Sequence, residues 1–374
     1  PALLLAARGW SRWLGGETGG LLTPGQLLPA FLILLAPFCL LSGWFFPVAC
    51  AAIGPLGGNG RGLIGRVYGW EAWGMCLGGL TATVMVVIGV ANMSLAVGAG
   101  LLTFGAILGS RIWLRERWGL LGLGLAGLML LWSASWDYQS RRWQLPGWEV
   151  VTVAETPYNL WQVTRAPGLV SFHANGLWCG SWPDPHTAEE QVHFTLLQHP
   201  RPQRVLLLGG GIFGLLAEIF RHPTVTEVVY VEPDPGLVQL AHQVLPPEAT
   251  QVLRDPRLSV IRQDGRRWLQ EERQRYDVIL LALPEPKTAQ LNRYYTEEFL
   301  QLVRDRLEPE GVFGFGLPGS ETSLSPGRRR YLQLIATTVR RVFPELVVLP
   351  TTRWSFVAGN RPEGLTRDPQ VLIS

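Results

Sequence analysis

The feature that most constrains the fold of this 374-residue chain is an apolar run followed by closely spaced glycines. Residues 205–208 are apolar, four glycines follow within six positions, and an apolar helix-forming segment leads to a second apolar run that ends on Glu232. This order predicts a strand, a phosphate-type loop, a helix and a second strand with a carboxylate at its end. The glycines of the loop are Gly209, Gly210, Gly211 and Gly214.

Such a loop is suited to a nucleotide. Glycines let the backbone approach a ligand closely, and a helix N-terminus offers unpaired N–H groups. The carboxylate of Glu232 can accept two hydrogen bonds from ribose hydroxyls. Gly209, Gly211 and Gly214 also have the spacing of the dinucleotide fingerprint. The loop alone therefore leaves both a nicotinamide cofactor and an S-adenosyl compound open.

The next strands distinguish between these ligands. A third strand at 258–263 ends in Asp264-Gly265, and Tyr276-Asp277 opens a fourth at 278–282. The motifs GGG-x-x-G, VE-x-D, DPR, QDG and YDVI, in this order, resemble the spermidine synthase family of aminopropyltransferases over residues 149–359.

That resemblance implies an α/β, seven-strand, methyltransferase-like (Rossmann-like) domain. It implies binding of decarboxylated S-adenosylmethionine, S-adenosylmethionine or methylthioadenosine, with Glu232 on the ribose and Asp264, beside Gly265, on the adenine amino group. No residue after the glycine fingerprint supplies a hydride-transfer site. A nicotinamide-dependent dehydrogenase is therefore the third of three functional hypotheses.

The amine-handling carboxylates of the family are mostly replaced. Aminopropyl transfer needs a base and anionic groups that hold the ammonium groups of the substrates. The family has one aspartate directly after the first glycines and two in a D-x-x-D-P segment after the fourth strand. These places fall here on Ile212, Ala282 and Glu285, so Glu285 is the remaining candidate catalytic carboxylate. We therefore predict little spermidine formation from putrescine.

The N-terminal part predicts membrane helices. No charged residue lies between Glu17 and Arg61, and further long apolar stretches occupy 72–110 and 118–136. These lengths exceed or approach the roughly 20 residues needed to cross a bilayer, which favours four spans. This region resembles bacterial proteins in which transporter-like helices are fused to a spermidine-synthase-like domain. Those relatives carry more helices upstream, so the resemblance implies a truncated N-terminus.

Four parts follow from these patterns. We expect an α-helical transmembrane domain at 1–137, a linker at 138–147, a small antiparallel β-hairpin domain at 148–200 and the nucleotide-binding domain at 201–374. The expected location is the bacterial inner membrane, as a multi-pass protein. Positive-inside counting of arginines is close to a tie. Because S-adenosyl compounds are made in the cytoplasm, we place the nucleotide-binding domain there.

Charge and cysteine content exclude several other classes. The formal net charge is +3, without a nucleic-acid-binding patch, and the four cysteines and six histidines have no metal-ligand or disulfide-scaffold spacing. Two functions remain open. One is an aminopropyltransferase of polyamine type acting on an amine other than putrescine. The other is a pseudoenzyme, binding an S-adenosyl nucleoside or no ligand, that serves as a scaffold subunit of a larger membrane complex or homo-oligomer in the lipid bilayer.

Overall fold

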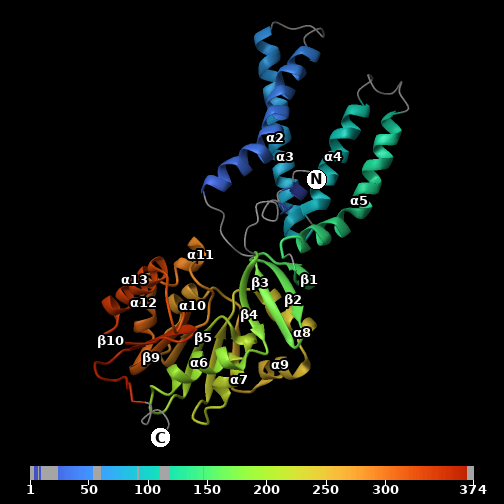
Figure 1. The fold of residues 1–374 in the computed structure, drawn as a ribbon. Helices are drawn as coiled ribbons and strands as arrows, with labels where there is room; N and C mark the ends of the chain where they lie inside the picture. The colour runs from blue at the N-terminus through green and yellow to red at the C-terminus, as the bar shows by residue number, and fades with distance from the viewer. Residues whose placement is uncertain are drawn as a thin grey trace. The chain divides into compact units, whose positions relative to one another are not determined.

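The computed structural model describes residues 4–6, 8, 9, 24–53, 60–90, 92–109, 118–145 and 147–368. The chain divides into two compact units, Pro1–Pro157 and Tyr158–Ser374 (Figure 1). Parts of the expected transmembrane domain, such as 10–23 and 110–117, lie outside the described residues, as does Pro146 of the expected linker. The two units are described separately below.

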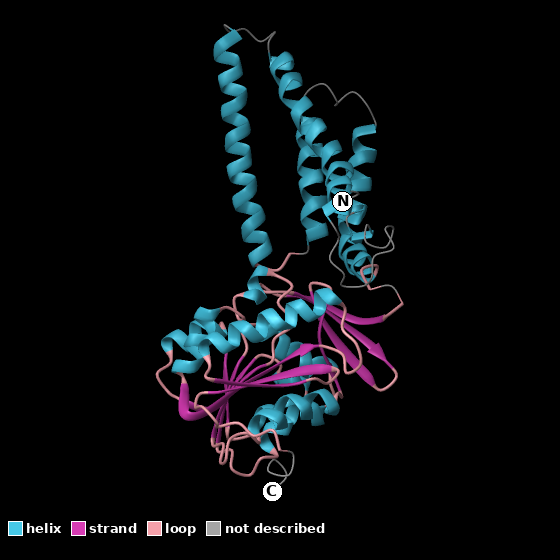
Figure 2. Ribbon diagram, turned by 60° about the vertical axis from the view of Figure 1, so that its left-hand side comes forward, coloured by secondary structure: helices cyan, strands magenta, loops and turns pink. Residues whose placement is uncertain are grey.

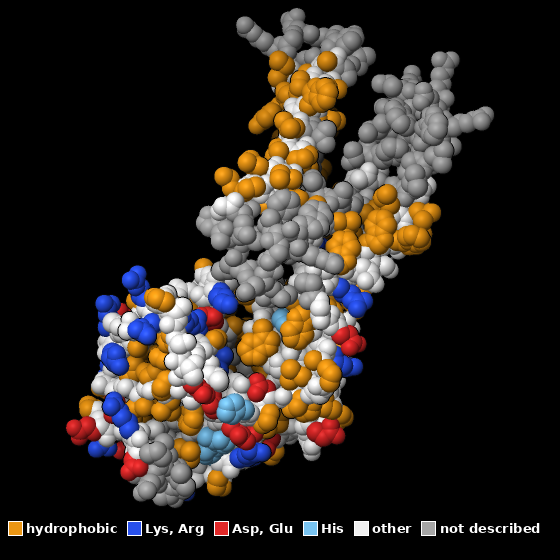
Figure 3. Space-filling view, viewed as in Figure 1, with side chains coloured by type: hydrophobic (Ala, Val, Ile, Leu, Met, Phe, Trp, Pro, Cys, Tyr) orange, Lys and Arg blue, Asp and Glu red, His pale blue; other side chains and the backbone are white. Residues whose placement is uncertain are grey.

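The first unit is mainly helical. Its elements are α2 (Pro24–Ile53), α3 (Gly60–Val87), α4 (Asn92–Gly109), α5 (Trp118–Arg142) and the strand β1 (Glu149–Glu155). Within the described residues, two helices are long and apolar enough to cross a membrane, over Leu28–Ala51 and Ile64–Val87. Large apolar side chains project from them without cover, and Figure 3 draws them in orange along α2. Four helices thus stand where four spans were predicted, and two of them meet the requirement for a span.

A buried group of charges joins separate segments of this unit. Asp137 on α5 accepts hydrogen bonds from Arg8 Nη2 at 2.8 Å and from Arg141 Nε at 2.6 Å. Arg141 Nη2 also lies 2.6 Å from Glu155 on β1. Arg8, Asp137 and Arg141 are all buried, whereas the side chain of Glu155 is 46% exposed. Asp137 is therefore the carboxylate on which two buried guanidinium groups depend.

We expect Asp137→Asn to destabilise the first unit by about 3–5 kcal/mol, because it removes the carboxylate paired with buried Arg8 and one of the two carboxylates paired with buried Arg141. Glu155→Gln is the matched control, since a half-exposed pair contributes only about 0–1 kcal/mol. Thermal unfolding of the detergent-solubilised chain, followed by far-UV circular dichroism, measures the difference. Equal transition temperatures for the two variants would contradict the role of Asp137.

The second unit begins with a small antiparallel sheet. Its strands β2 (Leu160–Ala166), β3 (Leu169–Ala174) and β4 (Leu177–Trp182) follow one another as hairpins. The β3–β4 turn is Asn175-Gly176, and both residues have positive φ, at +52° and +80°. Asn and Gly tolerate this conformation, which is why the Asn-Gly pair forms a tight turn. The predicted β-hairpin element is thus confirmed.

A seven-stranded sheet forms the rest of the unit, as predicted. Its order is β10-β11-β9-β8-β5-β6-β7; β5 to β9 run parallel, and β11 is antiparallel to both β9 and β10. The strands are β5 (Arg204–Leu208), β6 (Glu227–Val231), β7 (Leu258–Ile261), β8 (Tyr276–Leu281), β9 (Leu307–Pro318), β10 (Glu345–Leu349) and β11 (Arg353–Gly359). Near-continuous apolar runs such as 205–208 are typical of parallel strands covered on both faces.

Helices cover both faces of this sheet (Figure 2). They are α6 (Pro185–Leu196), α7 (Leu215–Phe220), α8 (Pro235–Val244), α9 (Pro247–Gln251), α10 (Gly265–Glu271), α11 (Ala289–Asn292), α12 (Glu297–Asp305) and α13 (Pro326–Val342), with short 3₁₀ turns at Gly211–Phe213 and Val252–Arg254. The core under α12 and α13 is rich in aromatic rings, including the stacked pair Phe315 and Phe356, 4.9 Å apart. This rigid sheet positions the loops at its carboxyl edge, where ligands bind in such folds.

Candidate functional site

The glycine loop follows β5 and has a conformation that side chains would obstruct. Gly209, Gly210 and Gly214 have φ of +75°, +70° and +97°. Gly211 has an ordinary φ, but a Cβ there would lie 2.7 Å from Cζ of Tyr230. The loop therefore needs glycine at three positions for its backbone angles and at one for space.

The loop packs tightly against the segment that follows β8. A Cβ on Gly209 would lie 2.5 Å from Cδ2 of Leu283, and one on Gly210 would lie 2.6 Å from Cβ of Ala282. Because β5 and β8 are neighbours in the sheet, their carboxyl ends open side by side. The alanine that replaces a family aspartate therefore lies directly against the loop.

Glu232 lies just past the end of β6 and is 6% exposed. Its Oε2 accepts a hydrogen bond from the Tyr230 hydroxyl at 2.9 Å, and its Oε1 accepts one from the Asp234 backbone N–H at 3.2 Å. Burial raises the pKa of Glu232 to about 7, and these two hydrogen bonds oppose the shift. The carboxyl group is thus held in place before any ligand arrives.

Asp264 stands at the start of α10 and has three partners. Its Oδ1 accepts the N–H of Arg267 at 3.1 Å, which caps the helix. Its Oδ2 accepts the Tyr294 hydroxyl at 2.7 Å and a guanidinium N–H of Arg293. Gly265 follows, and a Cβ there would lie 3.3 Å from Leu208. The sequence contains no signal for Arg293 or Tyr294, because they lie 29 and 30 positions after Asp264 along the chain.

These groups surround one cavity of about 230 Å³. Gly209, Gly210, Glu232 and Asp264 line it, whereas Gly211, Gly214 and Gly265 support its walls from behind. The small sheet contributes Tyr158, Trp161, Asn175 and Cys179 to the lining. Trp161 Nε1 donates to Asp234 Oδ2 at 2.7 Å, which fastens the small sheet to the segment after β6. Four of the seven predicted nucleotide-binding residues thus line one cavity.

The three positions of the replaced family carboxylates have separate environments. Ile212 is 2% exposed and is not part of the cavity lining, and its neighbour Phe213 lines the cavity instead. Ala282 does line it. Glu285 pairs with Arg328 on α13 and lies 3.6 Å from Lys287, outside the lining. The candidate catalytic carboxylate is therefore held in ion pairs beside the cavity.

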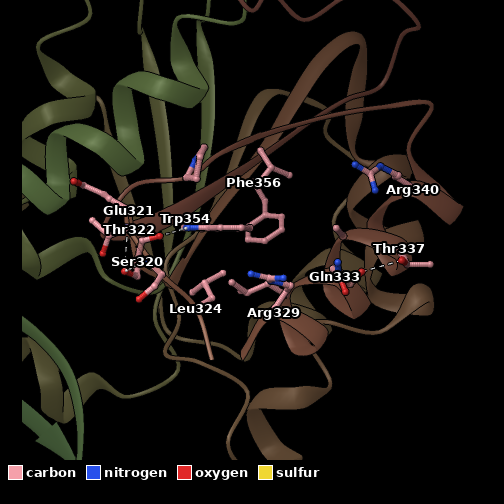
Figure 4. Close-up of a pocket in the computed structure, with 15 residues that line it drawn as sticks. Ser320, Glu321, Thr322, Leu324, Arg329, Gln333, Thr337, Arg340, Trp354 and Phe356 are labelled. Carbon is pink, nitrogen blue, oxygen red and sulfur yellow. Dashed lines mark hydrogen bonds between the residues drawn. The ribbon is translucent and has the colours of Figure 1, made fainter. Parts of the chain in front are cut away.

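A larger groove of about 770 Å³ lies elsewhere, along α13 and the loop after β9 (Figure 4). Leu324, Trp354 and Phe356 give it apolar walls, and Arg329 and Arg340 stand at its edges. None of its lining residues belongs to the glycine loop or to the segments after β6, β7 and β8. Its size alone does not make it the site, because the convergent polar groups lie in the smaller cavity.

Among the described residues, no three or more His, Cys, Asp or Glu side chains are grouped as metal ligands. Two histidines do meet on the surface: His193 Nδ1 lies 2.9 Å from His222 Nε2, and His193 Nε2 lies 3.2 Å from Glu218. Burial and the neighbouring His193 lower the pKa of His222. This cluster joins α6 to α7 and is separate from the cavity.

The fold and the site define a class. A seven-stranded sheet, with glycines after its first parallel strand and carboxylates after the next two, is the architecture of the methyltransferase-like α/β proteins. Residues 186–351 match the family model of the spermine/spermidine synthase domain. Residues 186–351 are thus similar to the spermine/spermidine synthase domain.

Individual relatives agree with this assignment. The chain is 31% identical over 228 residues to a polyamine aminopropyltransferase of Leptospira interrogans, covering 59% of this chain and 45% of that protein. It is 33% identical over 174 residues to one of Korarchaeum cryptofilum, covering 46% of this chain and 53% of that protein. It spans about half the length of these curated relatives. The crystal structure of spermidine synthase from Thermotoga maritima superposes with a TM-score of 0.50 at 25% identity, covering 58% of this chain and 74% of that one.

We expect Gly211→Ala to destabilise the second unit by about 1–3 kcal/mol, because its methyl group would overlap the buried ring of Tyr230. Gly327→Ala is the control. No atom lies within 4 Å of a Cβ there, and alanine favours the helix. Urea unfolding of the full chain, followed by tryptophan fluorescence, reports both variants. A Gly211→Ala variant as stable as Gly327→Ala would contradict the packing argument.

The raised pKa of Glu232 predicts a stability that depends on pH. Below its usual pKa of 4.5 the carboxyl group is protonated in both the folded and the unfolded state, so it does not lower the free energy of unfolding. As the pH rises from 4.5 to about 7, only the unfolded state ionises freely, so the unfolding free energy falls by on the order of 3 kcal/mol. Glu232→Gln should remove this loss.

The Gln variant is therefore expected to be more stable than the wild type at pH 8 but not at pH 4, without added nucleoside. Urea unfolding at the two pH values measures this. Glu310→Gln is the control, because Glu310 is an exposed carboxylate paired only with exposed Arg361. The same pH profile for Glu232→Gln and Glu310→Gln would show that burial of Glu232 carries no such cost.

Proposed function

We propose that residues 158–368 bind decarboxylated S-adenosylmethionine in the 230 Å³ cavity and transfer its aminopropyl group to an amine. The observation that carries this is the convergence of Glu232 and Asp264 on one cavity beside the glycine loop. In this proposal the carboxylate of Glu232 accepts hydrogen bonds from the ribose hydroxyls, and Asp264 accepts one from the adenine amino group. The match to the spermine/spermidine synthase domain supports the same ligand class.

The remaining wall of the cavity suits the rest of the donor. Gly210, Ala282 and Cys179 line its inner end with small groups, which leaves room for a sulfonium centre and its substituents. Burial and nearby Glu232 raise the pKa of the Cys179 thiol to about 12, with a backbone hydrogen bond opposing them. The thiol is therefore neutral and does not compete with the acceptor as a nucleophile.

Methylthioadenosine is expected to bind to the full chain with a Kd in the micromolar range, and Asp264→Asn and Glu232→Gln are each expected to weaken it at least tenfold. Titration calorimetry at pH 8 measures this. Gln333→Ala, in the separate groove along α13, is the matched control and should bind normally. Absence of heat with any adenosyl ligand would overturn the proposal.

A second candidate is a non-catalytic subunit that retains the fold and the nucleoside site. Two residues favour it. Ile212 is buried and apolar where the resemblance implies an aspartate, and Glu285 is held in an ion pair with Arg328, so neither offers a free carboxylate to the acceptor. Release of methylthioadenosine distinguishes the two candidate functions. Release of methylthioadenosine from decarboxylated S-adenosylmethionine in the presence of amines supports the enzyme, whereas binding without release supports the scaffold.

We also propose that α2 and α3 anchor the chain in a bilayer, which for a bacterial protein of this kind is the inner membrane. Their exposed apolar side chains need lipid or a partner helix to cover them. Further spans by α4 and α5, a cytoplasmic nucleotide-binding domain, and assembly into a larger membrane complex or homo-oligomer are parts of the same proposal.

A further inference from the structure

A second, smaller space opens from the inner end of the nucleoside cavity. It measures about 30 Å³, and it shares Cys179, Gly210, Phe213 and Ala282 with the larger cavity. Its other walls include Asp184, Gln191 and Arg353. We call this space the arginine compartment. It lies where a group that attacks the donor beside Ala282 would extend.

We propose that the acceptor of this domain is an amine that also carries a carboxylate, such as a short amino acid, with the carboxylate held in the arginine compartment by Arg353. This inference rests on the proposed function, because it names the acceptor class of the same site. It departs from a diamine acceptor, which brings a second ammonium group instead of an anion.

The positive charge of Arg353 favours an anionic group in the arginine compartment. Arg353 begins β11, its Nη2 donates to the Gly316 carbonyl at 2.8 Å, and its Nε is buried without an acceptor. The nearby carboxylates, Asp184 and Glu285, act on it without a direct ion pair in the described structure. Glu285 is instead paired with Arg328. A half-buried guanidinium without a direct counter-ion among the described residues attracts an anion and repels an ammonium group.

The only carboxylate among the lining residues of the arginine compartment is Asp184, and it already has two roles. Its Oδ1 accepts the N–H of Thr187 and so caps α6. Its charge also supports that of Arg353. With alanine at 282, the lining offers an entering ammonium group no carboxylate besides Asp184.

Size is the second argument. About 30 Å³ admits roughly two water-sized groups, which matches the two oxygens of a carboxylate. The ring of Phe213 limits expansion, because it packs edge-to-face on Phe172, 5.5 Å away, and against Gly180.

The reaction balances with the donor already proposed. The neutral amine nitrogen attacks the aminopropyl methylene carbon that is bonded to the sulfonium. A C–N bond forms, and the bond between that carbon and sulfur breaks. The sulfur takes the bonding electron pair and leaves as methylthioadenosine. The acceptor ammonium gives one proton to water before attack, and the product is an N-(3-aminopropyl) amino acid with a protonated secondary amine.

The test measures methylthioadenosine release from decarboxylated S-adenosylmethionine by the full chain in detergent. Glycine, β-alanine, γ-aminobutyrate and putrescine are the acceptors, and mass spectrometry identifies the products. We expect at least one amino acid to react ten times faster than putrescine. Arg353→Gln should lower the ratio of the amino-acid rate to the putrescine rate at least tenfold, whereas Arg353→Lys should keep part of this preference. Arg329→Gln, an exposed arginine in the groove along α13, is the matched control.

Calorimetry with methylthioadenosine is run on every variant. Arg353 does not line the nucleoside cavity, so the Kd should stay within about twofold, and a larger loss of binding in both Arg353 variants would show a structural role and overturn the inference. Faster reaction with putrescine, or an unchanged preference in Arg353→Gln, also overturns it. Nucleoside binding without release for any acceptor overturns it in favour of the scaffold. Failure to bind any nucleoside overturns the proposed function itself.

Discussion

The close packing of the glycine loop against the segment after β8 is the constraint on which the rest of the site depends. Gly209 lies against Leu283 and Gly210 against Ala282, with no room for a Cβ on the loop. This contact fixes the inner end of the cavity, and it also requires a small residue at 282. Ala282 therefore gives this wall a small, uncharged side chain.

Burial of Glu232 links stability to the proposed binding. The carboxyl group is held by Tyr230 and Asp234 and is shielded from water, so ionisation near pH 7 costs folding free energy. Ribose hydroxyls would supply the donors that the ionised form needs. If the proposed nucleoside binds there, those donors would offset the cost of ionising a buried carboxyl group.

The two ends of the site differ in how they handle charge. At the nucleoside end Glu232 and Asp264 both face the cavity, and Asp264 is supported by Arg293 and Tyr294. At the inner end the apolar residues Phe213 and Ala282 stand beside Arg353. A site that keeps its donor contacts and changes the charge around its acceptor would alter specificity without altering the fold, since function resides in sites carried by folds.

The sequence alone determined the parts that depend on local order along the chain. The apolar runs, the glycines, the Asn-Gly turn and the acidic residues at strand ends specified a seven-stranded α/β domain, a hairpin unit and four residues that line the cavity. Parallel strands bring their carboxyl ends to one edge, so Glu232 and Asp264 could be placed together without coordinates. The tertiary structure decided the inner end. Whether Ile212 or Phe213 faces the cavity depends on one turn of 3₁₀ helix. Glu285 pairs with Arg328 of α13, and Arg353 of β11 lines the same small cavity as Ala282, because α13 packs on the sheet and β11 pairs with β9 inside it. Contacts between such distant segments depend on packing, and no periodicity in the sequence encodes them.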